Sequence, residues 1–119
     1  METSTIGDRI PEEAVQLLEA LLKDDEPVAR ALRAQIPHLR VTGHCPCPCP
    51  SIDFAPDRAT VAAAPVTGNP VVEAEMLDAD GRPVGGVLLF AFDGYLSNLE
   101  IYSWADEPIT ELPPPDRLA

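Results

Sequence analysis

Three cysteines alternate with three prolines in the stretch CPCPCP, which places Cys45, Cys47 and Cys49 at every second position. Thiolates are preferred ligands of zinc and also carry thiol–disulfide chemistry, and His44 directly before the run adds an imidazole. This stretch is therefore the first candidate for a metal or redox site.

The spacing of the run argues against one shared zinc ion. In an extended strand, at about 3.3 Å per residue, the Cα atoms of Cys45 and Cys49 would lie roughly 13 Å apart. A zinc–sulfur bond is about 2.3 Å long, so each cysteine Cα can lie only about 5 Å from a common ion. A mononuclear site would need the strand to bend and to recruit other ligands. We favour the alternative, in which the thiols continue the apolar stripe of Leu39 and Val41 as small buried side chains.

The prolines of the run predict an edge strand. Successive residues of an extended chain present their backbone polar groups to opposite edges, so prolines at alternate positions remove N–H donors from one edge only. Ile52 and Phe54 follow with a parity opposite to that of the cysteines. If both sets are buried, the strand needs an extra residue or a break between Cys49 and Ile52.

Two short helices are expected before this strand, within residues 11–36. Leu17 and Leu21 belong to an apolar stripe at near-helical spacing in the first. Pro27 suits the first turn of the second helix, and Pro37 ends it.

From Leu39 onward the hydrophobic period changes to two, which is the period of a strand. Leu39 and Val41 share one face with the cysteines. The opposite face is predicted to hold Arg40, Thr42 and His44.

An antiparallel sheet of four to five strands is expected between residues 39 and 104. Alternation in VVEAEML, the turn sequence DADGRP and the apolar run VGGVLLFAF predict a strand, a turn and a second strand. Asp93-Gly94 is a strong hairpin signal before the last strand, LSNLEIYSW. Short connections favour pairing in chain order, so the pattern predicts a meander. The predicted fold class is α+β: one domain over residues 1–119, with an N-terminal helical hairpin packed on the meander and an irregular proline-rich tail at 105–119.

The last expected strand places Glu100, Tyr102 and Trp104 on one face and Leu99 and Ile101 on the other. The preceding strand is apolar on both faces, whereas the helices can cover only one side of the sheet. The second side must be covered by the C-terminal segment, by a second copy of the chain or by a protein partner. Because Tyr and Trp are favoured at interfaces, we predict that Glu100, Tyr102 and Trp104 bind a partner.

Charge restricts the kind of partner. The chain of 119 residues has a formal net charge of -12, and residues 70–119 hold ten acidic side chains against Arg82 and Arg117. Nucleic-acid binding needs a basic face, so the sequence predicts no nucleic-acid partner and favours a basic protein. No apolar run approaches the roughly 18 residues that span a bilayer, and acids stand where a signal peptide has basic residues. We therefore expect no membrane association and a cytoplasmic location.

No complete catalytic constellation is recognisable, and we expect no catalytic residue and no cofactor. Asp78, Asp80 and Gly81 resemble part of a calcium loop, but Leu89 occupies the position of its final bidentate acid, which favours an ordinary hairpin turn. A metal-binding or thiol-redox protein, with zinc held by the cysteine run and His44, is the alternative from a different functional class.

Two stretches resemble small uncharacterised proteins of actinobacterial type: CPCPCPSIDF and GYLSNLEIYSWADEPITELPPPDRL. In that group an alternating Cys run precedes Ser-x-Asp, and a terminal strand leads into a Leu-Pro-x-Pro segment. The resemblance covers most of residues 39–119 but carries over no functional residue, because the group has no assigned activity. Some relatives in such groups are suspected immunity or accessory proteins of toxin systems, and an acidic chain would suit a basic toxin. We therefore expect a non-enzymatic interaction domain that binds a protein partner or forms a homodimer.

Overall fold

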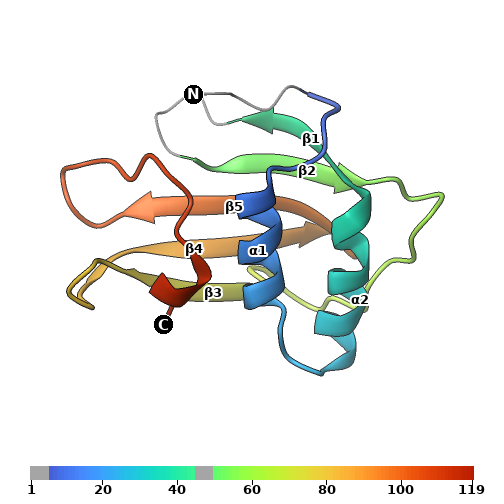
Figure 1. Ribbon diagram of the computed structural model, residues 1–119. Helices are drawn as coiled ribbons and strands as arrows, with labels where there is room; N and C mark the ends of the chain where they lie inside the picture. Colours follow the sequence, from blue (N-terminus) through green and yellow to red (C-terminus); the bar gives the residue numbers. More distant parts are fainter. Residues whose placement is uncertain (1–5, 45–49) are drawn as a thin grey trace.

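The chain folds into a pair of helices and one five-stranded antiparallel sheet, which confirms the expected α+β class. The computed structural model describes residues 6–44 and 50–119. Its elements in chain order are α1 (Glu12–Leu21), α2 (Pro27–Gln35), the 3-10 helix η1 (Ile36–His38), β1 (Leu39–His44), β2 (Ile52–Pro56), β3 (Val72–Leu77), β4 (Pro83–Phe92), β5 (Tyr95–Ser103) and the 3-10 helix η2 (Pro115–Arg117). Both helices lie on one side of the sheet, which we call the helix side (Figure 1).

Each helix begins where the sequence offers a suitable first turn. α1 follows Pro11 and carries Glu12 and Glu13 in its first turn, where carboxylates interact favourably with the helix dipole. α2 begins at Pro27, whose fixed φ suits the first helical position. The side chains that the helices bury are Ala14, Leu17, Leu18 and Leu21 of α1 and Leu32 and Gln35 of α2.

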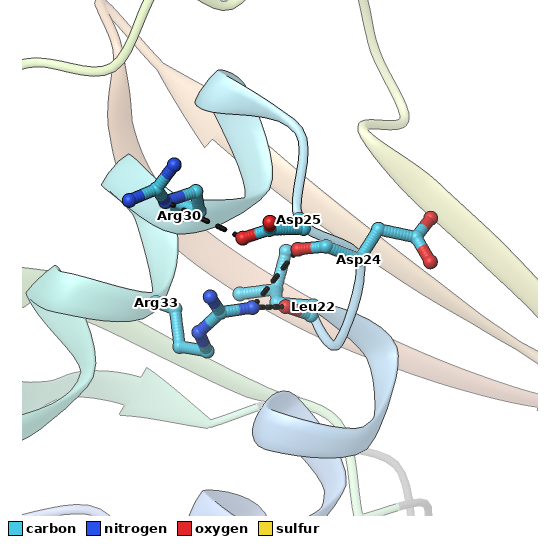
Figure 2. Close-up of polar contacts among 5 residues, drawn as sticks. All are labelled: Leu22, Asp24, Asp25, Arg30 and Arg33. Carbon is cyan, nitrogen blue, oxygen red and sulfur yellow. Dashed lines mark hydrogen bonds and ion pairs between the residues drawn. The ribbon is translucent and has the colours of Figure 1, made fainter.

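The connection between the helices is held by an arginine of α2. Arg33 donates from Nη1 to the backbone carbonyls of Leu22 and Asp24, the latter at 3.0 Å (Figure 2). Carbonyls at the end of a helix have no partner within the helix, so the guanidinium satisfies the carbonyl of the C-cap residue Leu22 and also binds the connection at Asp24. Arg30 lies 3.5 Å from the carboxylate of Asp25, but both side chains are exposed, so this ion pair contributes little.

Strand order departs from chain order at one connection. The sheet runs β1-β2-β5-β4-β3, so β3, β4 and β5 form a meander while β1 and β2 form a separate hairpin. β2 pairs with β5, with Ile52 opposite Leu99. The sequence pattern left residues 55–70 unassigned; in the structure residues 55 and 56 end β2, and residues 57–71 connect β2 to β3 at the far edge of the sheet. Within this segment, the backbone N–H of Ala64 donates to the carbonyl of Gly94 in the β4–β5 turn.

Leu39 and Val41 lie on a different strand from Ile52 and Phe54, because β1 pairs antiparallel with β2, with His44 opposite the buried Ile52. The cysteines lie outside the described residues, so the extra residue or break expected between Cys49 and Ile52 stays a prediction. A separate β-bulge occurs within β1, where the register shifts at Thr42, directly after Val41. This bulge moves His44 to the face of Val41, so the predicted placement of His44 on the opposite face is wrong.

Tight turns join β3 to β4 and β4 to β5. Asp93 and Gly94 have φ values of 55° and 86°, as the hairpin signal predicts. In the β3–β4 turn, the Asp78 carboxylate accepts hydrogen bonds from the backbone N–H groups of Asp80 and Arg82, both at 2.9 Å. The bond from Arg82 is the main reason why the pKa of Asp78 lies below its ordinary value of 3.8. The carboxylate that resembles a calcium ligand thus stabilises a hairpin turn.

Terminal segments pair with both outer strands of the sheet. Val41 of β1 donates its backbone N–H to the carbonyl of Asp8 and accepts a hydrogen bond from Gly7, each at 2.8 Å. Glu75 of β3 exchanges two backbone hydrogen bonds with Ala119, at 3.0 and 3.2 Å. Unpaired edge strands are templates for self-association, and these segments satisfy part of each edge.

The C-terminal segment packs on the helix side. Ile109, Leu112 and Leu118 pack against the core, and η2 contacts α1. Figure 1 shows this segment passing over β4 and β3 beside α1. Gly85 leaves room for it, because a Cβ at this position would lie 2.9 Å from Cδ1 of Ile109. The expectation that the C-terminal segment could cover the second side of the sheet is therefore wrong.

Gln35 connects the helices to the sheet through hydrogen bonds. Its side chain is 0% exposed and donates from Nε2 to the carbonyls of Ala62, at 3.1 Å, and Gly94, at 2.9 Å. Its Oε1 accepts a hydrogen bond from the backbone N–H of Leu96 at 2.9 Å. One buried amide thus ties α2 to the segment after β2 and to the start of β5.

We predict that Gln35→Leu lowers the free energy of unfolding by about 2 kcal/mol or more, because the buried N–H of Leu96 loses its acceptor. The matched control is Gln16→Leu on the exposed face of α1, which should change stability by less than about 0.5 kcal/mol. Urea unfolding followed by circular dichroism measures both. An equal loss in the two variants would contradict the structural role of Gln35.

Candidate functional site

The sheet has a second side, opposite the helices and the C-terminal segment. We call it the open face. Directly paired residues point to the same side of a sheet, so the register assigns outward positions on β3, β4 and β5. These positions are Glu73, Glu75, Gly86, Leu88, Phe90, Asn98, Glu100 and Tyr102. The helices and the C-terminal segment lie together on the other side (Figure 1).

β4 runs through the middle of the open face and is apolar along it. Leu88 and Phe90 are half-buried, and Phe92 at the end of the strand is 62% exposed. The alternate residues Val87 and Leu89 are fully buried on the helix side. A strand with one face in water normally alternates apolar with polar residues. The apolar outward positions of β4 therefore indicate a surface that is suited to contact with another molecule.

The residues predicted to bind a partner lie together on the open face. Glu100 is opposite Leu88 in the β4–β5 pair, and Tyr102 follows two residues later on the same side. The backbone N–H of Trp104 donates to the carbonyl of Val84 at 3.0 Å, which continues the alternation beyond the end of β5. The rings of Tyr102 and Trp104 lie 6.3 Å apart, centroid to centroid, at an angle of 42°. The residues that alternate with them are buried on the helix side, as the period of two predicts: Leu99 and Ile101.

Tyr102 is held in place by a glycine on the neighbouring strand. Gly86 is its direct partner across the β4–β5 pair. A Cβ at Gly86 would lie 2.1 Å from the hydroxyl oxygen of Tyr102 and 2.2 Å from its Cζ, so the ring occupies the space of the missing side chain. Tyr102 as a whole remains 39% exposed, and Trp104 beside it is 55% exposed. This packing presents the two aromatic side chains to solvent in a defined arrangement.

Carboxylates surround the apolar part of the open face. Leu88 lies between Glu73 on β3 and Glu100 on β5, and Glu75 lies across β4 from Tyr102. All three glutamates are exposed. Among the described residues, the ion pairs are Arg30 with Asp25 and Arg58 with Asp93, so none involves these glutamates. Sequence reasoning missed Glu73 and Glu75, because alternation indicates that they point outward but not which strand lies beside them.

A shallow pocket of about 400 Å³ lies at the β4–β5 turn end of the open face, lined by Asp53, Phe92, Tyr95 and Asn98 among others. Arg58 borders it, with its guanidinium 4.4 Å from the centroid of the Tyr95 ring. Its lining contains no His or Cys, and its ionisable side chains are Asp53, Arg58 and Tyr95. The pocket lies next to the apolar residues of the open face; no feature of the sequence had indicated Arg58.

The cysteine run is the other candidate site. Cys45, Cys47 and Cys49 lie outside the described residues, as does the edge strand predicted for them. His44 is exposed at the end of β1. Within residues 6–44 and 50–119, no three His, Cys, Asp or Glu side chains are grouped to hold a metal ion. The metal and redox hypothesis therefore stays a prediction.

Comparisons with protein-family models, with curated proteins and with solved structures found no match for this chain. In the part of the chain that the structure describes, neither helix is long and apolar enough to cross a membrane.

We predict that Gly86→Ala lowers the free energy of unfolding by about 1–3 kcal/mol, because its Cβ would displace the ring of Tyr102. In a Tyr102→Ala background the same change should cost close to nothing, since the space is then free. Chemical unfolding of the four proteins in this cycle gives the coupling energy, which we expect to exceed about 0.5 kcal/mol. Additive losses would show that Tyr102 does not lie over Gly86.

For the cysteine run, we predict that protein purified under reducing conditions carries no equimolar zinc, because the spacing of the thiols does not suit one ion. Elemental analysis measures the metal, and a variant with all three cysteines changed to serine is the control. Equimolar zinc that disappears in this variant would establish the metal-binding alternative.

Proposed function

We propose that this protein is a small, acidic, non-enzymatic interaction domain that binds another protein through the open face. The observation that carries the proposal is the one-sided cover of the sheet. Both helices and the C-terminal segment pack on the helix side, while β4 carries Leu88, Phe90 and Phe92 on the other. A partner would bury these side chains.

The energetics favour such a contact. Burying an apolar side chain that was exposed is worth about 1.5–3 kcal/mol, and part of this gain is still available at each outward position of β4. Tyr102 and Trp104 add two large rings at one end of the same surface. Because Gly86 holds Tyr102 in place, binding would cost little side-chain entropy there. Aromatic side chains in such positions are typical interface anchors.

A role as an immunity or accessory protein is one form of this proposal. It would use the same surface, and the strong acidity of the chain supports a basic target such as a cationic toxin. A test of the open face does not depend on that role, because it requires a bound protein but not knowledge of which protein it is.

The test combines stability with binding. We expect Trp104→Ala to weaken the complex with a partner recovered from the native cells by about 2 kcal/mol or more, as for an interface anchor. Its effect on the melting temperature of the isolated domain should be small, because the side chain is 55% exposed. The matched control is Ile6→Ala, since Ile6 is 70% exposed on the N-terminal segment, and it should bind like the wild type.

Thermal melts at two protein concentrations accompany the binding measurements. If Trp104→Ala lowers the free energy of unfolding by roughly 3 kcal/mol at both protein concentrations, Trp104 is a core residue and the proposal is wrong. Unchanged affinity in both Trp104→Ala and Leu88→Ser would place the binding surface elsewhere.

A further inference from the structure

We infer that the open face selects a cationic amphipathic segment of a partner protein and rejects a second copy of this chain. The inference rests on the proposed function and specifies its partner by charge. It follows from the carboxylates that frame the apolar side chains of β4.

The geometry places carboxylates on both sides of an apolar centre. Glu73, Leu88 and Glu100 lie in one row across three neighbouring strands. Strands are about 4.8 Å apart, so the backbones that carry the two glutamates lie roughly 10 Å apart with the leucine between them. Glu75 extends this acidic border along β3. A segment lying on Leu88 would have to place its own flanking groups close to these carboxylates.

Within the described chain these carboxylates have no cation of their own. The ion pairs of Arg30 and Arg58 lie elsewhere, at the turn between the helices and beside the β4–β5 turn. Arginine or lysine side chains on each side of an apolar residue would complement Glu73, Glu75 and Glu100. A guanidinium of the partner could also form cation–π contacts with the exposed rings of Tyr102 and Trp104 at the end of the same surface.

A second copy fits this surface poorly. Two open faces in contact would bring both sets of glutamates together around the buried leucines. Each chain also carries a formal net charge of -12. Like charges that approach within about 8–10 Å repel each other at physiological salt, and the cost rises when they are desolvated. The framing acids therefore oppose self-association while leaving the apolar centre accessible to a cationic partner.

The protein contains a single tryptophan, which supplies the probe. Because Trp104 lies on the open face and is 55% exposed, its fluorescence emission should shift when a ligand covers the surface. The ligands are two synthetic amphipathic peptides with identical leucine positions and no aromatic residues. One has arginine and lysine at its polar positions, and the other has glutamate.

Three forms of the full chain are compared. The open-face variant carries Glu73→Gln, Glu75→Gln and Glu100→Gln. The control variant changes the same amount of charge at exposed positions away from the open face, with Glu19→Gln, Glu26→Gln and Glu111→Gln. We expect the basic peptide to bind the wild type and the control variant alike. Its affinity for the open-face variant should be at least about tenfold weaker, and added salt should reduce the difference. The acidic peptide should not bind.

Sedimentation equilibrium tests the second half of the inference. The wild type should stay monomeric, and the open-face variant should self-associate more than the control variant, because its apolar centre is no longer framed by charge. A wild-type dimer that Leu88→Glu dissociates would make a second copy the occupant and overturn the inference.

The remaining outcomes separate this inference from the proposed function. Absence of saturable binding of the basic peptide, or equal weakening in the two triple variants, would overturn charge selection at this surface. If the native partner loses affinity for Trp104→Ala but binds the open-face variant normally, the surface is a docking site and the partner is not cationic. If the native partner binds both Trp104→Ala and the open-face variant with unchanged affinity, both proposals are wrong.

Discussion

A single sheet with helices on one side leaves its other side to solvent or to a partner, and this constraint governs the whole molecule. The apolar side chains of α1 and α2 require a sheet face to pack against, and the helix side provides it with residues such as Val87, Leu89 and Leu99. The C-terminal segment brings further apolar side chains to the same side. The core is therefore completed without using the outward residues of β4, which remain as surface.

Local patterns in the sequence predicted both helices and the strands β1, β3, β4 and β5, but not β2 as a separate strand. Alternation over residues 72–77 predicted β3, because side chains of a strand point to its two faces in turn. Asp93-Gly94 predicted the β4–β5 hairpin, since both residues tolerate the positive φ that this turn needs. The same alternation placed Glu100 and Tyr102 on one side of the sheet, which is the part of the candidate site that local reasoning could supply.

Contacts between distant segments were not predictable in this way. No local sequence pattern predicts that β2 lies beside β5. This pairing depends on which strands can pack their apolar faces together against the helices. The bulge at Thr42 is set by the pairing of β1 with β2, and it reversed the expected direction of His44. Gln35 reads as an ordinary polar residue of a helix until the carbonyls of Ala62 and Gly94 are placed beside it.

The framing of Leu88 by glutamates has two physical consequences that reinforce each other. An exposed apolar strand is a risk for aggregation, and charges beside it are a recognised protection. On the binding proposal, the same charges would lower the affinity of the surface for an acidic partner, while a cationic partner would gain both the apolar contact and the charge complement. Solubility of the free domain and discrimination between partners would therefore be supplied by one set of side chains. A neutral substitution at these positions would have to affect both properties together, because the carboxylates that keep copies apart are those that would hold a partner.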